Sequence, residues 1–347
     1  METIRLGKTE MRVSKLGFGG IPIQRVSEDD AMAVVRRCLE LGINFIDTAN
    51  AYTTSEERIG KAISGHRPSV FLATKSHART PDEISQNLKL SLKRLGVDYI
   101  DLYQFHGVSD FKSLDLVLDP NGPMTVVEKA KRAGVIKHIG ISSHQIDVAK
   151  KAVKSDRFET IMFPFSFICS EAADELLSLA REHDVGFIAM KPLEGGMVDN
   201  VTIAFKYLFQ FPDVLPIPGI EKIPEIEEIV KVLEGSWQMT EVEQQEMKRL
   251  KEEIGPGFCH RCDYCQPCVQ EIPISMVMGV RSFFKRSPPE RFFEMVDLAM
   301  VKAATCTECG DCETRCPYNL PIREMIAEEI KWYLEEKRKF QERLVSK

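Results

Sequence analysis

Eight short apolar runs are the feature of this sequence that most constrains its fold. They recur roughly every 25 to 35 residues, and the stretches between them are amphipathic. Several of these stretches begin with capping residues, such as Ser27 before Glu28 and Thr80 before Pro81, as helices do. Short apolar runs that alternate with helical patterns predict repeated βα units. The runs are residues 16–18, 43–46, 70–73, 99–105, 136–141, 160–165, 186–190 and 214–217.

Eight βα units fit two architectures, a closed (β/α)8 barrel and a doubly wound open sheet, and periodicity alone does not choose between them. Three ionisable residues, Asp47, Lys75 and His106, lie just after the second, third and fourth runs, where the strands reach their carboxyl ends. In a barrel the carboxyl ends of the strands form one rim around a shared pocket, so these residues favour the barrel. The glycines within residues 17–20 suggest a dinucleotide loop only weakly, because the third glycine of GxGxxG falls on Pro22. We therefore predict an α/β fold built on a (β/α)8 TIM barrel.

The sequence also predicts where the barrel begins and ends. Residues 3–6 and 12–16 alternate on either side of a short turn, which predicts an N-terminal hairpin. Gly255-Pro256-Gly257 breaks the helical pattern that follows the eighth unit, and the composition changes directly after it. We therefore predict a barrel domain at residues 1–255 and a smaller domain at residues 256–347.

Composition and charge exclude several classes of protein. With 44% hydrophobic residues, 28% charged residues and a net charge of -6, the chain has the composition of an ordinary soluble protein. The acidic balance argues against a nucleic-acid partner. The charged start lacks the apolar segment of a secretory signal, and the longest uncharged run, residues 160–170, is shorter than the ~20 residues of a membrane helix. We therefore expect a cytoplasmic protein without a membrane partner.

A set of proton-transfer groups lies at the expected rim: Asp47, Tyr52, Lys75 and His106. A phenol is a poor acid at neutral pH, and a neighbouring ammonium makes it a better one by favouring the phenolate. Lys75 is suited to act in this way on Tyr52, with Asp47 keeping the ammonium charged and His106 orienting a substrate oxygen. Each residue alone more often has a structural role, such as capping a helix. The four together favour a site in which Tyr52 gives a proton to a carbonyl oxygen while a hydride arrives at the carbon.

A series of short motifs surrounds these residues: Asn44-Phe45-Ile46-Asp47-Thr48-Ala49, Tyr52, Ser55-Glu56-Glu57, Thr74-Lys75, Tyr99-Ile100-Asp101-Leu102-Tyr103 with His106, and Gly140-Ile141-Ser142-Ser143. With these motifs the sequence resembles the aldo-keto reductase family over about residues 1–235. Members of that family are (β/α)8 barrels with an N-terminal hairpin, and they use NADP or NAD to interconvert carbonyls and alcohols. The resemblance implies that Asp47, Tyr52, Lys75 and His106 take the family's four catalytic positions, with Tyr52 as the acid/base.

The same resemblance implies a nicotinamide cofactor along one side of the rim. Ser142 and Ser143 take the positions that hold the nicotinamide carboxamide, although the family has an asparagine where Ser143 stands. The family's glutamine appears here as Met162, and its nicotinamide-stacking aromatic residue appears as Met190. The loop of residues 192–196 would follow the pyrophosphate. The implied cofactor contacts are Gly20, Asp47, Ser142, Ser143, Met162, Met190, Pro192, Leu193 and Gly219.

The choice between NAD(H) and NADP(H) depends on residues near the adenosine. Where NADP-preferring members have basic residues, this sequence has Gly219 and Glu225. A carboxylate would repel the 2'-phosphate and can instead accept hydrogen bonds from the ribose hydroxyls, which gives a weak preference for NAD(H). Lys222 lies close by and opposes that preference.

The cysteines divide the chain unevenly, because eight of the ten lie after residue 258. They form one CxxCxxCxxC run and one CxxCxxCxxxCP run. In a reducing compartment such crowding indicates metal or cluster ligation. Three thiolates at this spacing can surround one corner of a cuboidal cluster and leave the fourth iron to a distant cysteine. A zinc site is the alternative, although structural zinc more often uses two separated CxxC pairs. Cys38 and Cys169, outside both runs, are expected to be core thiols.

Both runs resemble those of bacterial two-cluster ferredoxins, and some aldo-keto reductase relatives carry a C-terminal domain with two 4Fe-4S clusters. That resemblance implies one cluster on Cys259, Cys262, Cys265 and Cys316, and another on Cys306, Cys309, Cys312 and Cys268. The segment between the runs looks helical, which suggests a mostly α-helical ferredoxin-like domain. A charged helix is expected from Pro321, with a docking stripe of Ile326, Ile330, Tyr333 and Phe340.

The leading hypothesis is an NAD(P)-linked oxidoreductase for a small carbonyl or alcohol, fused to a cluster module that exchanges electrons with a ferredoxin-like or other redox partner. A hydride carries two electrons and a cluster passes one at a time, and no flavin motif is evident to split them. The clusters are therefore structural, serve a partner or serve a substrate radical step. The alternative from another class is a redox-sensing or electron-transfer subunit whose barrel binds nicotinamide cofactor without turnover. A zinc-stabilised enzyme is a third possibility.

Overall fold

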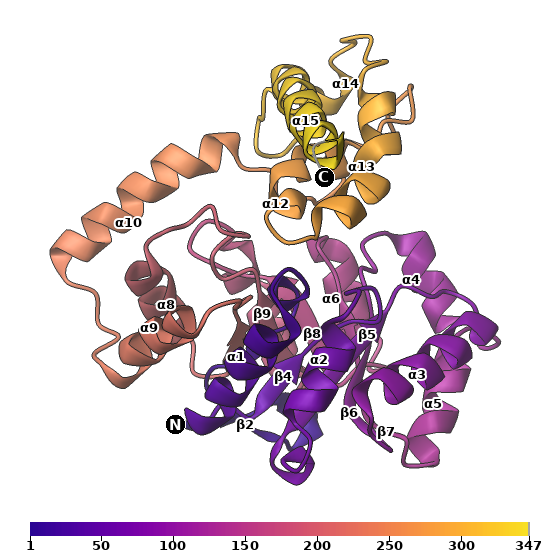
Figure 1. Cartoon of the computed structure of the whole chain (residues 1–347), viewed down its shortest axis with the longest axis vertical. Coiled ribbons are helices and arrows are strands. Elements are labelled where there is room, and N and C mark those ends of the chain that lie inside the picture. The colour runs from indigo at the N-terminus through magenta and orange to yellow at the C-terminus, as the bar shows by residue number, and fades with distance from the viewer. Residues whose placement is uncertain (346–347) are drawn as a thin grey trace. The chain divides into compact units, whose positions relative to one another are not determined.

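The computed structural model describes residues 1–345, and the chain forms two compact units, Met1–Met247 and Lys248–Lys347 (Figure 1). The division falls inside helix α10 (Glu241–Ile254), a few residues before the change of composition at Gly255. Each unit has its own buried core. No helix in the described part of the chain is long and apolar enough to cross a membrane.

The first unit is built on eight parallel strands in the order of the sequence. Neighbouring strands pair in parallel, and the two edges also meet, because Gly17 N donates to Pro216 O at 2.9 Å and Gly19 N to Pro218 O at 2.8 Å. The predicted barrel is therefore confirmed, and all eight apolar runs contribute a strand. The strands are β3 (Phe18–Gly19), β4 (Phe45–Asp47), β5 (Phe71–Ser76), β6 (Ile100–Phe105), β7 (Ile136–Ser142), β8 (Thr160–Pro164), β9 (Gly186–Met190) and β10 (Val214–Ile217).

Helices lie around the strands (Figure 1), and they bury one apolar face each. In α1, Ala31, Val34, Val35 and Cys38 are buried, at the spacing of one helix face. The sequence signals mark the helix starts, since Thr80 and Glu83 form a capping box at the start of α3. These helices are α1 (Glu28–Glu40), α2 (Ser55–Ala62), α3 (Pro81–Leu95), α4 (Phe111–Leu118), α5 (Met124–Arg132), α6 (Ile146–Lys154), α7 (Leu176–Glu182), α8 (Val201–Phe209) and α9 (Ile223–Glu234).

The predicted N-terminal hairpin, β1 (Thr3–Arg5) and β2 (Arg12–Ser14), is present as an antiparallel pair. Its apolar side chains, Ile4 and Leu6 among them, form one cluster with inward-facing residues of six barrel strands. A Cβ on Gly186 would lie 2.7 Å from the Leu6 side chain, so the hairpin approaches β9 closely. Because the strands begin at this end, the hairpin closes the amino-terminal end and leaves the carboxyl end for chemistry.

The second unit is helical, as its sequence predicts. Phe292, Val296 and Ala303 of α13 form its core together with residues of α11 and α15. The expected docking stripe of the last helix is confirmed, since Ile326 and Tyr333 are buried and Ile330 and Phe340 pack against the same core. The helices are α11 (Ile274–Met278), α12 (Val280–Phe284), α13 (Pro289–Ala303), α14 (Asp311–Thr314) and α15 (Ile322–Val345).

Candidate active site and cysteine pockets

The four predicted proton-transfer residues lie together at the carboxyl ends of adjacent strands. Asp47 ends β4, Lys75 lies near the end of β5, and His106 follows β6. The Lys75 ammonium donates to the Asp47 carboxylate and, at 2.8 Å, to Thr48 O. It lies 5.0 Å from the ring centroid of Tyr52. The Tyr52 and His106 rings meet edge to face, with centroids 5.9 Å apart.

Asp47 and Lys75 form a buried ion pair, with side chains 3% and 2% exposed. Burial raises the pKa of Asp47, although Lys75 opposes that shift. Burial alone would lower the pKa of Lys75, but the Asp47 carboxylate and the Tyr52 oxygen outweigh it and raise the pKa above its usual value. Lys75 is therefore an ammonium at neutral pH and directs its charge at the phenol.

Gln104, to which the sequence analysis gave no role, supports this pair. It is fully buried, and its amide donates to Asp47 Oδ1 at 3.1 Å, while its own Oε1 has no partner within residues 1–345. Gln104 pairs in register with Lys75 and lies two residues from Leu102, which faces the barrel interior. The alternation of side chains along β6 was the signal that could have identified it.

His106 is held by its main chain and by two rings. Its N–H donates to Ser76 O at 2.9 Å, and its carbonyl accepts from Arg79 Nη2 at 2.7 Å. The His77 ring stacks on it, with centroids 3.8 Å apart and planes 18° apart. Burial, then His77 and Lys75, hold the pKa of His106 well below its usual value. The ring is therefore a neutral imidazole that keeps a hydrogen-bonding atom, since its Nδ1 has no partner among the described residues.

The residues implied as nicotinamide contacts lie on several neighbouring strands. Ser142 ends β7 and accepts from Gly107 N at 2.9 Å, so its own hydroxyl hydrogen is not used in that bond. Ser143 donates to Gln145 O at 3.1 Å, at the start of α6. Met162 is buried in the barrel-interior cluster, and Met190 packs against that cluster.

The remaining implied contacts lie at the strand ends and in the loop after β9. Gly20 N donates to Asp47 O at 2.8 Å, and Gly219 pairs with Gly19 where the barrel closes. In the loop, Pro192 is buried and Leu193 is half-buried. The backbone of Gly195 and Gly196 has positive φ, 70° and 87°, which suits a loop whose amides approach a phosphate. Glycines and hydroxyl donors of this kind fit a dinucleotide.

Glu225, on which the preference for NAD(H) depends, has a structural role. Its carboxylate accepts from Glu221 N at 2.9 Å and from Lys222 N at 3.1 Å at the start of α9. These bonds cap a helix and do not remove the negative charge.

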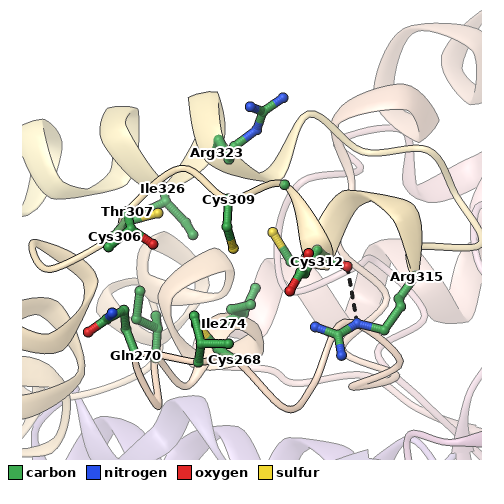
Figure 2. Close-up of a pocket in the computed structure, with 14 residues that line it drawn as sticks. Cys268, Gln270, Ile274, Cys306, Thr307, Cys309, Cys312, Arg315, Arg323 and Ile326 are labelled. Atoms are coloured by element: carbon green, nitrogen blue, oxygen red, sulfur yellow. Dashed lines mark hydrogen bonds between the residues drawn. The ribbon is translucent and has the colours of Figure 1, made fainter.

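The eight clustered cysteines of the second unit line two pockets. One, with an open volume of about 380 Å³, is lined by Cys268, Cys306, Cys309 and Cys312. The other, of about 340 Å³, is lined by Cys259, Cys262, Cys265 and Cys316. In each pocket three cysteines come from one run and the fourth from the other run. Figure 2 shows the first pocket, with Cys306, Cys309 and Cys312 across from Cys268 and Ile274.

Left-handed backbone turns the chain around each pocket. Arg261 and Asp263 have φ near 60° between the cysteines of the first run, and Glu308 and Gly310 have positive φ in the second. Burial raises the pKa of Cys262 to about 11 and that of Cys265 to about 12. Each pocket therefore offers four sulfur donors and a largely apolar floor, which is a donor set for a thiophilic metal or cluster.

Cys38 and Cys169 are buried within the first unit, as expected for core thiols.

The first unit is thus a closed βα barrel with a buried Asp–Lys pair beside a tyrosine and a neutral histidine at its carboxyl end. The model of the aldo/keto reductase family matches residues 15–202. The chain therefore belongs to the aldo/keto reductase family and is an oxidoreductase. The family match does not reach the cysteine pockets.

Similar proteins agree with this assignment. The chain is 32% identical over 212 residues to the uncharacterised oxidoreductase YqkF of Bacillus subtilis (strain 168), covering 57% of this chain and 67% of that protein. It is 31% identical over 217 residues to the L-galactose dehydrogenase of Arabidopsis thaliana, with the same coverage of each. Among solved structures, aldo-keto reductase AKR11C1 from Bacillus halodurans is 28% identical, with a TM-score of 0.62, covering 72% of this chain and 96% of that one.

Proposed function

We propose that the chain interconverts a small carbonyl compound and the corresponding alcohol with a nicotinamide cofactor, with Tyr52 as the acid/base. The observation that carries the proposal is the buried Lys75–Asp47 pair directed at the Tyr52 ring. A bound nicotinamide would supply or accept the hydride. In reduction, Tyr52 gives its phenolic proton to the carbonyl oxygen. Lys75 stabilises the phenolate that remains, and Asp47 keeps Lys75 charged and in place.

His106 has a separate part in this proposal. As a neutral imidazole it donates a hydrogen bond to the substrate oxygen without competing with Tyr52 for the proton transfer. Ser142, Ser143, Met162 and Met190 would hold the nicotinamide end of the cofactor. Gly20, Pro192, Leu193 and Gly219 would hold the rest.

The preference for NAD(H) over NADP(H) rests on Glu225 and stays a prediction. Measuring the rate of turnover with each cofactor tests it. A relative that is 29% identical over 224 residues, aldo-keto reductase yakc [NADP(+)] of Schizosaccharomyces pombe, carries NADP(+) in its name, and the chain covers 63% of it. A ratio of kcat/KM above one for NADH over NADPH would support the influence of Glu225. In the Glu225→Gln variant this ratio should fall.

The enzyme proposal is tested with Tyr52→Phe. This substitution removes the phenolic oxygen and keeps the ring, so NAD(P)H-dependent reduction of aldehydes should be lost while the melting temperature changes little. An unchanged rate would contradict the role of Tyr52. Nicotinamide binding without turnover across a panel of carbonyls, together with partner binding that requires intact cysteines, would favour the redox-sensing or electron-transfer subunit instead.

We propose further that the region of residues 256–347 holds two 4Fe-4S clusters, one in each cysteine pocket. The support is the four-cysteine composition of each pocket, with its fourth ligand drawn from the other run. The clusters would supply one-electron transfer to a ferredoxin-like or other redox partner. Anaerobic reconstitution should give about eight irons per chain. A colourless protein that contains zinc would refute this part and leave the barrel proposal standing.

A further inference from the structure

Arg79 is a half-buried cation at the mouth of the barrel, and its guanidinium forms no ion pair within the part of the chain that the structure describes. Its guanidinium donates to three main-chain carbonyls, His77 O at 3.0 Å, Ala78 O at 3.1 Å and His106 O at 2.7 Å. No carboxylate lies within ion-pair distance of it among residues 1–345. Carbonyl oxygens satisfy N–H groups but do not neutralise the cation, and a guanidinium has five N–H donors. Charge and donor capacity therefore remain.

Two carboxylates that act on Arg79 are already engaged in other roles. Glu83 accepts from the main-chain N of Arg79 at 3.4 Å and forms the capping box of α3 with Thr80. Burial lowers the pKa of Arg79, and the negative charge of Asp110 opposes that shift. The oxygens of Asp110 accept from Ser113 N at 2.8 Å and Ser113 Oγ at 2.6 Å, where they cap α4. Removing part of a charged group from water is unfavourable unless the charge is paired, and neither carboxylate forms an ion pair with the Arg79 guanidinium within the described residues. The guanidinium is therefore suited to bind an anion from outside the chain.

The position of Arg79 relates this anion to the carbonyl site. Its guanidinium contacts the main chain of His106, the residue proposed to orient the carbonyl oxygen. Besides burial, the groups that lower the pKa of His106 are His77, Lys75, His144 and Arg79. Lys75 is paired with Asp47, whereas the Arg79 guanidinium has no carboxylate within ion-pair distance among the described residues. Arg79 therefore places an unpaired positive charge beside His106, and this charge attracts an anionic substrate.

We propose that the substrate is an oxo acid, a small aldehyde or ketone that also carries a carboxylate. The carboxylate binds Arg79 through charge-assisted hydrogen bonds, and this contact brings the carbonyl group to Tyr52 and His106. The proposal rests on the proposed function of the site and adds its substrate class.

Matched substrates test the proposal in the wild type and in Arg79→Gln. The three carboxybenzaldehyde isomers place the carboxylate at different distances from the carbonyl, and their methyl esters are nearly isosteric but neutral. For the isomer that the wild type reduces best, Arg79→Gln should lower kcat/KM about 10- to 100-fold, mostly by raising KM. For the methyl ester of that isomer, the same substitution should lower kcat/KM by less than about threefold. Arg79→Lys should retain part of the preference. Lys112→Gln, which removes an exposed charge on α4, should leave kcat/KM unchanged for both the acid and the ester.

Equal losses for the acid and the ester would show that Arg79 only clamps the loop to His106, and would overturn the proposal. The proposal would also be overturned if the wild type reduced the methyl ester faster than the acid for all three isomers. Calorimetry with benzoate and benzamide gives a readout that needs no turnover. The wild type should bind benzoate about tenfold more tightly than benzamide, and Arg79→Gln should bind the two with equal affinity. If this preference holds but no carbonyl is reduced, the proposed function fails and the anion site stands.

Discussion

Replacing Lys75 by methionine separates the structural and chemical roles of the buried ion pair. The substitution nearly preserves volume, but it leaves the Asp47 carboxylate buried, 3% exposed, with only the Gln104 amide at 3.1 Å. Removing one partner of a buried pair typically costs about 3–5 kcal/mol, because the other charge is left uncompensated. The free energy of unfolding of Lys75→Met should therefore fall by about that amount.

The double variant Asp47→Asn/Lys75→Met removes both charges and keeps both shapes. Replacing an ion pair by neutral groups of similar volume is often nearly neutral for stability, so the double variant should recover most of the lost free energy. Activity should not recover with it, because no ammonium remains beside the Tyr52 ring. Carbonyl reduction should stay at least about 100-fold below wild type in both variants.

Urea unfolding of the three proteins at pH 7, followed by circular dichroism, measures the stabilities, and NADPH oxidation with an aldehyde measures the rates. A Lys75→Met variant within about 1 kcal/mol of wild type would refute the claim that the pair is buried and coupled. A double variant that regains activity would refute the role of the ammonium in proton transfer.

Three further predictions concern other parts of the chain. Burial lowers the pKa of Lys15 to about 8, so the unfolded chain binds more protons than the folded one between pH 8 and 10.5. The free energy of unfolding of wild type relative to Lys15→Met should rise with pH across that interval by at most about 3 kcal/mol, measured by urea unfolding. Gln104→Leu removes the bond to Asp47 and should lower kcat about tenfold with little change in KM, whereas unchanged steady-state kinetics would deny it a positioning role. Cys316→Ser should expose Cys259, Cys262 and Cys265 to alkylation in the anaerobically reconstituted protein while the other pocket stays protected, as mass spectrometry can show; alkylation of Cys306, Cys309 and Cys312 instead would refute the crossed pairing.

The barrel and the position of its catalytic end could be predicted because both follow from local patterns. An apolar run bounded by helix signals is a strand wherever it occurs, and a polar residue at the end of a run lies at the rim whatever the strand order. Asp47, Lys75 and His106 were found in this way. Gln104 was not found, because a single uncharged polar residue within an apolar strand does not by itself indicate a functional role.

The cofactor side was harder to predict, because its geometry depends on contacts between distant parts of the chain. Met162 was expected to stand where the family has a glutamine. It belongs to the same hydrophobic cluster as Ile4 and Leu6 of the N-terminal hairpin, a grouping that no local pattern encodes. Arg79 was missed for the same reason, since its partners are the carbonyls of its own loop and of the residue after the next strand.

The division of the eight clustered cysteines into two sets of four was implied by the resemblance to two-cluster ferredoxins, and each set lines one pocket. The carbonyl step needs none of them: within the barrel, Cys38 and Cys169 are buried, and burial raises the pKa of Cys38 to about 12, so neither thiol is a nucleophile at neutral pH. The proton in the proposed reaction comes from Tyr52 and the two electrons travel as a hydride. The proposed reaction at the barrel rim and the proposed clusters in the cysteine pockets therefore share no residue, and a substitution at either site should leave the intrinsic chemistry of the other unchanged.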